Sequence, residues 1–181
     1  MIIERNAVRA ILLAPLPGSS GKDTSAAQHQ RPQEELQEEL QVLLMKVQPP
    51  QGRKTFWITP GGGMEEGESA ESCLRRELQE ELGITEMEIG PLVWRRQHTF
   101  TWGEKRYCQR ENIYIVRTRP FVPHISDAVE AKVLQCFRWW PLVELSRTTE
   151  TLTPLSLAEI IQRYLREGAP KELPEMEVLV D

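Results

Sequence analysis

A cluster of three glutamates is the feature of this sequence best suited to chemistry. In a helix, Glu77, Glu80 and Glu81 would lie at positions i, i+3 and i+4, so their carboxylates would share one face. Like charges at this spacing destabilise a helix by about 0.2–0.5 kcal/mol per pair. A multivalent cation would remove that repulsion, and ligand sets made only of oxygen favour Mg²⁺ or Mn²⁺ over zinc. The cluster therefore predicts half of a metal site.

A glycine-rich loop precedes the glutamates. Gly61, Gly62 and Gly63 follow Thr59-Pro60 and permit positive φ angles and close approach of the backbone to a ligand. Such a loop can offer carbonyl oxygens to a metal or amides to a phosphate. A glycine loop followed by stacked carboxylates suits a hard cation bound to a diphosphate.

The element that must carry the glutamates is a helix over residues 70–82. Ser69 suits the N-cap, the segment contains only residues that tolerate a helix, and Gly83 suits the left-handed position after its end. An apolar stripe lies about a quarter turn from the glutamates, so the helix can bury this stripe while its carboxylates line a cleft. The stripe consists of Leu74, Leu78 and Leu82.

This segment resembles the signature of the Nudix hydrolases, Gly-x5-Glu-x7-Arg-Glu-U-x-Glu-Glu-x-Gly-U, where U is a bulky aliphatic residue. Every specified position is filled, in order by Gly62, Glu68, Arg76, Glu77, Leu78, Glu80, Glu81, Gly83 and Ile84. The resemblance extends to the flanks 57–63 and 138–142 and so spans most of the chain. It implies an α/β fold, namely an α/β/α sandwich around a mixed β-sheet.

The resemblance also implies an activity and a set of metal ligands. Nudix hydrolases cleave the pyrophosphate linkage of a nucleoside diphosphate joined to another moiety, and Mg²⁺, with Mn²⁺ as the alternative, is the cofactor expected here. Glu80 and Glu81 match the metal ligands. Glu77 matches a third carboxylate that either binds metal or activates water, and Gly61 matches a glycine whose carbonyl completes the coordination.

The general base is less well defined by the resemblance. Arg76 and Glu68 match positions that pair to support the loop, whereas many family members use an acid downstream of the signature as the base. Here Glu130 is the preferred candidate, and Asp127 and Glu111 are alternatives.

Beyond the signature, the chain has the pattern of one α/β domain over residues 1–181. Strands are expected over residues 7–14, 42–47, 87–102, 107–117 and 137–140, a short helix over 34–41, and a last helix from Thr153-Pro154 to Gly168. The segment 15–39 is rich in polar residues and is expected to be a flexible insertion. A lid or a contact in a homodimer is the alternative for this insertion.

Charge and composition restrict the partners. The net charge of −5 argues against nucleic acid and anionic membranes, and no apolar run has the length of a membrane span. The three cysteines are widely spaced and no secretory signal is evident, which indicates reduced thiols and a cytoplasmic location. A decapping-type RNA enzyme would be expected to carry a basic path for RNA. A non-catalytic Nudix module that senses nucleotides or scaffolds partners remains the alternative to an enzyme.

The substrate is expected to be a small nucleoside diphosphate derivative, but the residues that would recognise it are poorly marked. Four tryptophans are candidates for stacking on a base, although packing in the core explains each of them as well: Trp94, Trp102, Trp139 and Trp140. Four arginines are candidates for phosphate contacts: Arg95, Arg96, Arg106 and Arg110.

Overall fold

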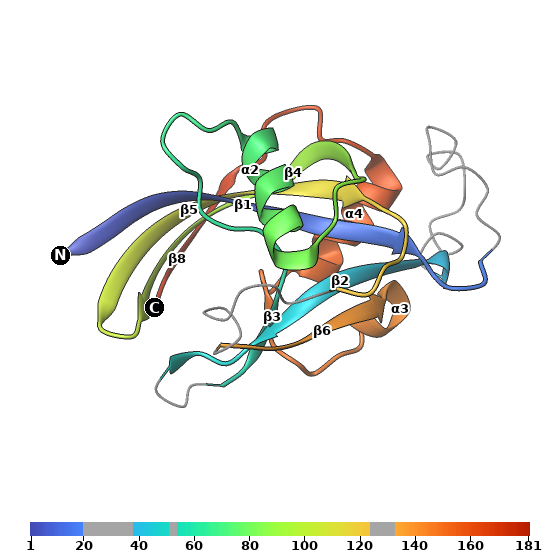
Figure 1. The fold of residues 1–181 in the computed structure, drawn as a ribbon, viewed down its shortest axis with the longest axis horizontal. Coiled ribbons are helices and arrows are strands. Elements are labelled where there is room, and N and C mark those ends of the chain that lie inside the picture. Colours follow the sequence, from blue (N-terminus) through green and yellow to red (C-terminus); the bar gives the residue numbers. More distant parts are fainter. Residues whose placement is uncertain (20–37, 51–53, 124–132) are drawn as a thin grey trace.

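A curled mixed β-sheet dominates the computed structural model, which describes residues 1–19, 38–50, 54–123 and 133–181 (Figure 1). Its eight strands, among the described residues, are β1 (Ile2–Pro15), β2 (Leu40–Val47), β3 (Phe56–Ile58), β4 (Glu88–Trp102), β5 (Lys105–Arg117), β6 (Leu134–Pro141), β7 (Leu152–Thr153) and β8 (Met176–Val180). The helices are α2 (Ala70–Leu82), α3 (Leu142–Leu145) and α4 (Leu157–Glu167).

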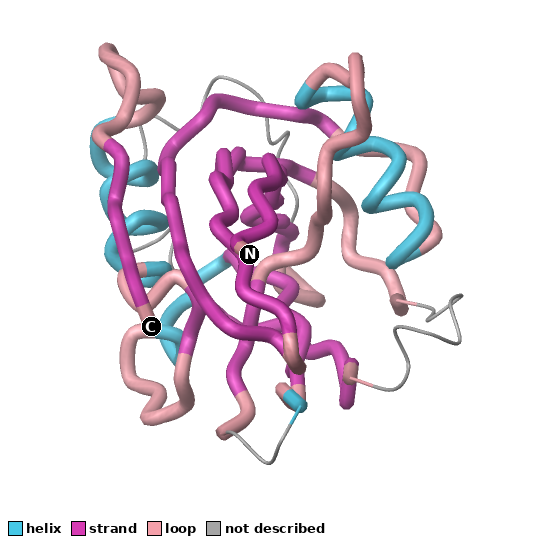
Figure 2. Tube along the Cα trace, turned by 90° about the vertical axis from the view of Figure 1, so that its left-hand side faces the viewer, coloured by secondary structure: helices cyan, strands magenta, loops and turns pink. Residues whose placement is uncertain are grey.

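The strand order is β7-β3-β2-β1-β5-β4-β8, and β6 pairs with β2 outside this path. The pairs β1–β5, β3–β7 and β4–β8 are parallel, whereas β1–β2, β2–β3, β2–β6 and β4–β5 are antiparallel. Strands β1, β4 and β5 are long and twist strongly, so the sheet curls, as seen end-on in Figure 2. The N-terminal half of β1 therefore lies beside the β4–β5 hairpin.

Alternation along β1 divides the core into two layers. Val8, Ala10 and Leu12 join the cluster that contains the leucines of α2, while Ile11 and Leu13 join the cluster that contains α4. Successive side chains of a strand point to opposite faces, so α2 and α4 cover opposite faces of the sheet. This is the α/β/α arrangement expected from the sequence.

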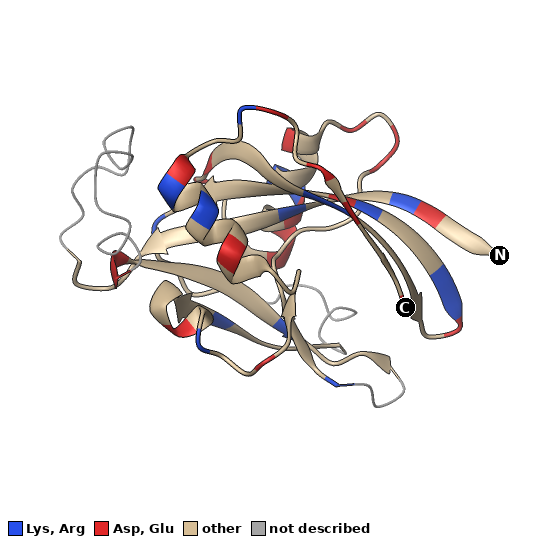
Figure 3. Cartoon of the chain, turned by 180° about the vertical axis from the view of Figure 1, so that it is seen from behind, with Lys and Arg blue, Asp and Glu red and all other residues tan. Residues whose placement is uncertain are grey.

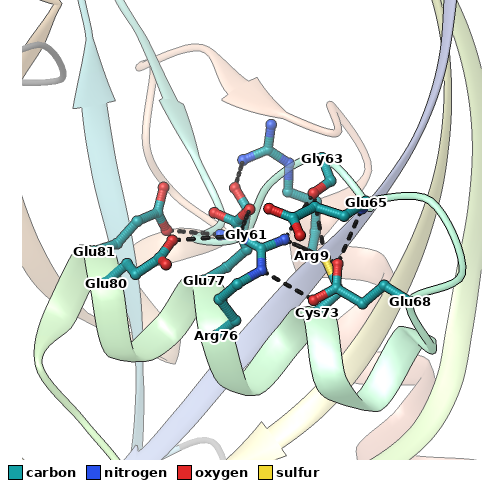
Figure 4. Close-up of polar contacts among 10 residues, drawn as sticks. All are labelled: Arg9, Gly61, Gly63, Glu65, Glu68, Cys73, Arg76, Glu77, Glu80 and Glu81. Carbon is teal, nitrogen blue, oxygen red and sulfur yellow. Dashed lines mark hydrogen bonds and ion pairs between the residues drawn. The ribbon is translucent and has the colours of Figure 1, made fainter.

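Helix α2 begins and ends where its caps predict. The Ser69 hydroxyl accepts a hydrogen bond from the Ser72 amide at 3.1 Å, and Gly83 has a φ of 73°, in the left-handed region. The apolar stripe of the helix is fully buried against the sheet. Packing of these leucines fixes the rotation of α2 and turns its glutamates toward the glycine loop (Figure 4).

Some elements differ from the expectation. Leu40 and Gln41 belong to β2 and not to a helix, because Leu40 is buried in the core and pairing with β1 satisfies the backbone. Strands β3, β7 and β8 were not predicted, and the last helix begins at Leu157 because Thr153 belongs to β7. The turn at Gly103-Glu104 joins β4 to β5 as expected. Residues 20–37 of the expected insertion lie outside the described residues. Within the part of the chain that is described, no helix combines the length and apolar character needed to cross a bilayer.

Candidate active site

The glycine loop is held against β1 by backbone hydrogen bonds. The Val8 amide donates to the Gly62 carbonyl at 2.9 Å, and the Ala10 amide donates to the Pro60 carbonyl at 2.8 Å. The loop therefore runs beside β1 as an additional edge of the sheet. Its position is set by a strand and not by the loop's own conformation.

Two of the three glycines lie in close contacts, one with backbone and one with the end of a side chain. Gly61 has a φ of 128°, and a Cβ there would lie 2.3 Å from the Val8 carbonyl oxygen. A Cβ on Gly62 would lie 2.3 Å from the carboxylate carbon of Glu77. Gly63 has open space at its Cβ position. The Glu77 carboxylate thus rests directly against the backbone at Gly62.

The three predicted glutamates reach the loop to different degrees. One carboxylate oxygen of Glu81, a residue that is 9% exposed, accepts the Gly61 amide at 2.9 Å. Glu77 is half-buried beside the loop, while the side chain of Glu80 is 62% exposed. The spacing in the sequence therefore brings all three to one side of the loop, with Glu80 at its solvent edge.

Arg76 lies among these carboxylates, as Figure 4 shows. Its guanidinium forms a bidentate ion pair with Glu68, with both N···O distances at 2.9 Å. This is the pairing expected from the resemblance. The same group also donates to Glu77 at 2.8 Å, to Glu80 at 3.3 Å and to the Gly63 carbonyl at 3.0 Å. Arg76 therefore ties the helix to the loop and offsets part of the negative charge.

Protonation states around Arg76 follow from these bonds. Hydrogen bonds from Arg76 lower the pKa of Glu68 to about 2, and the bond to Glu68 raises the pKa of Arg76. Burial raises the pKa of Cys73 to about 12, so its thiol is neutral and donates to the Gly63 carbonyl at 3.5 Å. Both charged groups remain ionised at neutral pH, and Cys73 acts as a packing residue below the loop.

The donor chemistry suits a hard divalent cation, although this conformation holds the carboxylates in other bonds. Among the described residues, no three acidic, histidine or cysteine side chains converge on one point. Glu77 and Glu80 bond to Arg76, and Glu81 bonds to the Gly61 amide. The candidate ligands are all oxygen atoms: the three carboxylates on one side of the loop, and the Gly61 carbonyl, which also accepts a hydrogen bond from Arg9. Such a set fits Mg²⁺ or Mn²⁺ once the carboxylates exchange their present bonds. The predicted base Glu130 and its alternative Asp127 lie outside the described residues.

Glu111, the remaining candidate base, lies in an enclosed network of hydrogen bonds. It is 1% exposed and accepts hydrogen bonds from Arg9, Arg96 and Gln109. Burial raises its pKa, but the charges and hydrogen bonds of Arg9 and Arg96 outweigh this effect and bring the pKa to about 2. A carboxylate that is so enclosed and so weakly basic does not suit removal of a proton from water.

Three of the four candidate tryptophans have partners within the fold. Trp140 packs in the core, Trp94 donates to Glu177 at 3.0 Å, and Trp139 donates to the Phe121 carbonyl at 2.9 Å. Of the four candidate arginines, Arg96 is the one that bonds to Glu111.

Arg9 also lies near the site, although it was not among the candidate residues predicted from the sequence. It donates to Glu111 at 3.1 Å and to the Gly61 carbonyl at 2.7 Å. The signal was available, because Arg9 is the one charged residue in the otherwise apolar stretch 7–14.

Comparison with known proteins agrees with this geometry. A family model described as the NUDIX domain matches residues 34–164. An RNA pyrophosphohydrolase from Sphingopyxis alaskensis is 31% identical over 112 residues, which cover 56% of this chain and 69% of that protein.

Solved structures share the fold. The NUDIX domain of Shewanella oneidensis NrtR, complexed with ADP ribose, has a TM-score of 0.58 and 19% identity, covering 91% of this chain and 90% of that one. The E. coli ORF135 protein has a TM-score of 0.53 and 23% identity, covering 94% and 96%. An Ap4A hydrolase from C. elegans has a TM-score of 0.55 and 16% identity, covering 89% and 97%. At these identities the similarity establishes the architecture alone.

Proposed function

The chain belongs to the Nudix family, and on that premise we propose that it is a divalent-metal-dependent pyrophosphohydrolase. Its substrate would be a nucleoside diphosphate linked to another moiety, such as a nucleotide, a sugar or a second nucleoside. One observation carries the proposal. Glu77 and Glu81 both meet the backbone of the glycine loop directly, at Gly62 and at the Gly61 amide.

The residues have distinct roles in this proposal. Glu80, Glu81 and the Gly61 carbonyl would hold Mg²⁺ or Mn²⁺, and Glu77 would be either a third ligand or the group that takes a proton from water. A bound divalent cation supplies charge neutralisation for the diphosphate and lowers the pKa of a bound water. Glu130 is our candidate for the general base. Positioning and neutralisation of charge would provide most of the rate enhancement.

Arg76 and the loop provide the preorganisation. Arg76 keeps Glu77 and Glu80 directed toward the loop through its own bonds, and its pair with Glu68 anchors it. Because the loop is bonded to β1, the Gly61 carbonyl is presented in a fixed direction. The fixed carbonyl would lose little entropy when a cation binds, whereas Glu77 and Glu80 would exchange Arg76 for the cation.

The test is a hydrolysis assay on a panel of diphosphate compounds, with Mg²⁺ or Mn²⁺ and with products identified by mass. The panel contains ADP ribose, Ap4A, nucleotide sugars and a 5′-triphosphorylated oligoribonucleotide. We expect cleavage within a diphosphate linkage, and a loss of about 10³-fold or more in Glu80→Gln and Glu81→Gln, because a catalytic metal supplies several kcal/mol. The control is Glu71→Gln, an exposed glutamate of the same helix that pairs with Arg75.

The outcome separates the enzyme from a non-catalytic module. Activity that persists in both Gln variants would sink the assignment of ligands. No hydrolysis across the whole panel with either metal would favour a nucleotide sensor or scaffold.

Hydrolysis of RNA 5′ ends is a second candidate, favoured by the relative that is an RNA pyrophosphohydrolase. The net charge of −5 weighs against it, and Figure 3 shows acidic and basic residues interspersed over the strands and helices. Binding of RNA normally depends on a basic surface. The triphosphorylated oligonucleotide in the panel tests this candidate, with salt dependence as a second readout.

A further inference from the structure

A cluster of arginines lies on the face of the sheet opposite α2. Arg9 follows Val8, whose side chain packs in the α2 cluster, so alternation along β1 directs Arg9 to the other face. There it shares the Glu111 carboxylate with Arg96, and Arg5 lies close enough for the charges of Arg9 and Glu111 to affect its pKa. We call Arg5, Arg9 and Arg96 the guanidinium cluster.

The charges of this cluster do not balance. Glu111 is the one carboxylate bonded to Arg9 and Arg96 among the described residues, and Arg5 stacks on Tyr107 at 4.8 Å. Burial, followed by the positive charge of Arg9, lowers the pKa of Arg5. Arg9 and Arg96, whose side chains are largely covered, share one carboxylate, and the exposed Arg5 lies nearby, so positive charge is in excess here. An excess of positive charge is a favourable environment for an anion.

Arg9 has donors available for that anion. Its Nε atom donates to Glu111, and its Nη1 atom donates to the carbonyls of Gly61 and Thr59, at 2.7 and 3.3 Å. No described residue accepts a hydrogen bond from Nη2, and this atom is not among the buried polar atoms that lack a partner. The side chain of Arg9 is 13% exposed, so part of it reaches solvent beside the loop.

Gly61 joins the guanidinium cluster to the carboxylates. Its amide donates to Glu81 from α2, while its carbonyl accepts from Arg9, which reaches the loop from β1 (Figure 4). One peptide segment therefore separates a group of carboxylates suited to a cation from an arginine suited to an anion. A metal-bound diphosphate needs both kinds of group within a few ångströms.

We propose that Arg9 binds the diphosphate of the substrate through Nη2, and that Glu111 is the positioning residue that holds Arg9 for this contact. The proposal rests on the proposed function for the class of ligand. Glu111 fixes Nε and so orients the plane of the guanidinium, while one lone pair of the Gly61 carbonyl fixes Nη1 and leaves the second lone pair for a metal. The remaining edge of the planar group then faces outward in one direction, as a phosphate oxygen requires.

Calorimetric titration of the full chain with inorganic pyrophosphate in EDTA tests the contact without metal or turnover. We expect measurable binding to the unaltered chain and a weakening of about 10- to 100-fold in Arg9→Gln, the effect of losing a charged hydrogen bond. Arg9→Lys keeps the charge beside Glu111 but loses the planar fork, so its affinity should fall between the two. Thermal unfolding of each variant reports whether it is folded.

The matched control is Arg110→Gln. Arg110 lies one residue before Glu111 on the opposite face of β5, where it is exposed and bonds to Glu4 and Gln97. This change removes the same charge from the same strand, and we expect the affinity for pyrophosphate to stay within about twofold, since exposed charges are screened. An equal loss in Arg110→Gln and Arg9→Gln would overturn the proposal, because net charge alone would then explain binding.

Two further results would also overturn it. These are the absence of pyrophosphate binding to the unaltered chain, and unchanged binding in a folded Arg9→Gln variant. Failure of the proposed function is a separate result, namely no hydrolysis in the panel while pyrophosphate binding still depends on Arg9. With an active substrate, Arg9→Gln should raise KM more than it lowers kcat, whereas Glu80→Gln should mainly lower kcat.

Discussion

The two sides of the glycine loop carry similar charged groups but differ in solvation. On the α2 side, Arg76 is 26% exposed and its partner Glu80 is 62% exposed, although Glu68 and Glu77 are mostly covered. On the opposite side, Glu111 and Arg96 are almost fully enclosed. Exposed ion pairs are weak and exchange partners readily, whereas breaking a buried pair is costly. The first side is therefore suited to exchanging Arg76 for a metal, and the second side is suited to holding its geometry.

The largest expected effect is a loss of stability when Glu111, on the side opposite α2, is replaced. Glu111→Ala leaves Arg9 and Arg96 without their shared carboxylate, and an uncompensated buried charge costs about 3–5 kcal/mol. Denaturant unfolding measures this loss, and Glu80→Ala on the exposed side is the matched variant, expected to change stability by less than about 1 kcal/mol. Equal effects of the two changes would remove the contrast between the sides.

Gly62→Ala should displace the Glu77 carboxylate and reduce activity without unfolding the chain. The added Cβ would lie 2.3 Å from the Glu77 carboxylate carbon, so the end of that flexible side chain must move. A displacement of this size can reduce kcat by about 10²-fold. Gly63→Ala, which adds the same atom into open space, should keep near-normal activity and is the control. Full activity in Gly62→Ala would show that the position of Glu77 is not critical.

Lowering the pH should destabilise the folded chain through protonation of Glu111. Its pKa is about 2 in the folded chain, below the ordinary value of 4.5, so its contribution to stability is complete above pH 4.5 and is lost as pH falls toward 2. Between pH 5 and pH 3 this one group should account for a loss of roughly 2 kcal/mol. Urea unfolding at both pH values should show a smaller drop in Glu111→Gln than in the unaltered chain. Identical drops would contradict the assigned protonation.

The smallest expected effect is the stabilisation of the folded chain by a bound divalent cation. A cation at tenfold excess over its dissociation constant stabilises the folded state by about 1.4 kcal/mol. We therefore expect Mg²⁺ or Mn²⁺ to raise Tm by a few degrees, EDTA to reverse the rise, and Glu81→Gln to abolish it. Arg110→Gln, at an exposed position of β5 that pairs with Glu4, should retain the rise in Tm. A rise that survives in Glu81→Gln would place the cation elsewhere.

The parts of the molecule that the sequence predicts are those with local causes. Helix α2 was predictable from Ser69, Gly83 and its leucines, since caps and periodicity act within a few residues. Strand β8 was not, because it is short and half-exposed and forms by parallel pairing with β4, far away in the chain. The signature motif likewise identified Glu77, Glu80 and Glu81 as one group.

Arg9 shows what the sequence alone does not predict. Its position within an apolar strand was visible, but its partners Glu111 and Gly61 lie 102 and 52 residues away. Only the parallel pairing of β1 with β5, and the docking of the loop on β1, bring these residues together. Non-local pairing of this kind leaves no periodic trace in the sequence.

The docking of the glycine loop on β1 also has a consequence for the order of folding. Helix α2 and the β4–β5 hairpin are built from contacts between near neighbours and can form early, whereas the bonds from Val8 and Ala10 to the loop close a segment of about fifty residues. The candidate site therefore takes shape only when the N-terminal strand joins the sheet. A peptide that contains the signature alone would form part of the helix but would not present the Gly61 carbonyl to a metal.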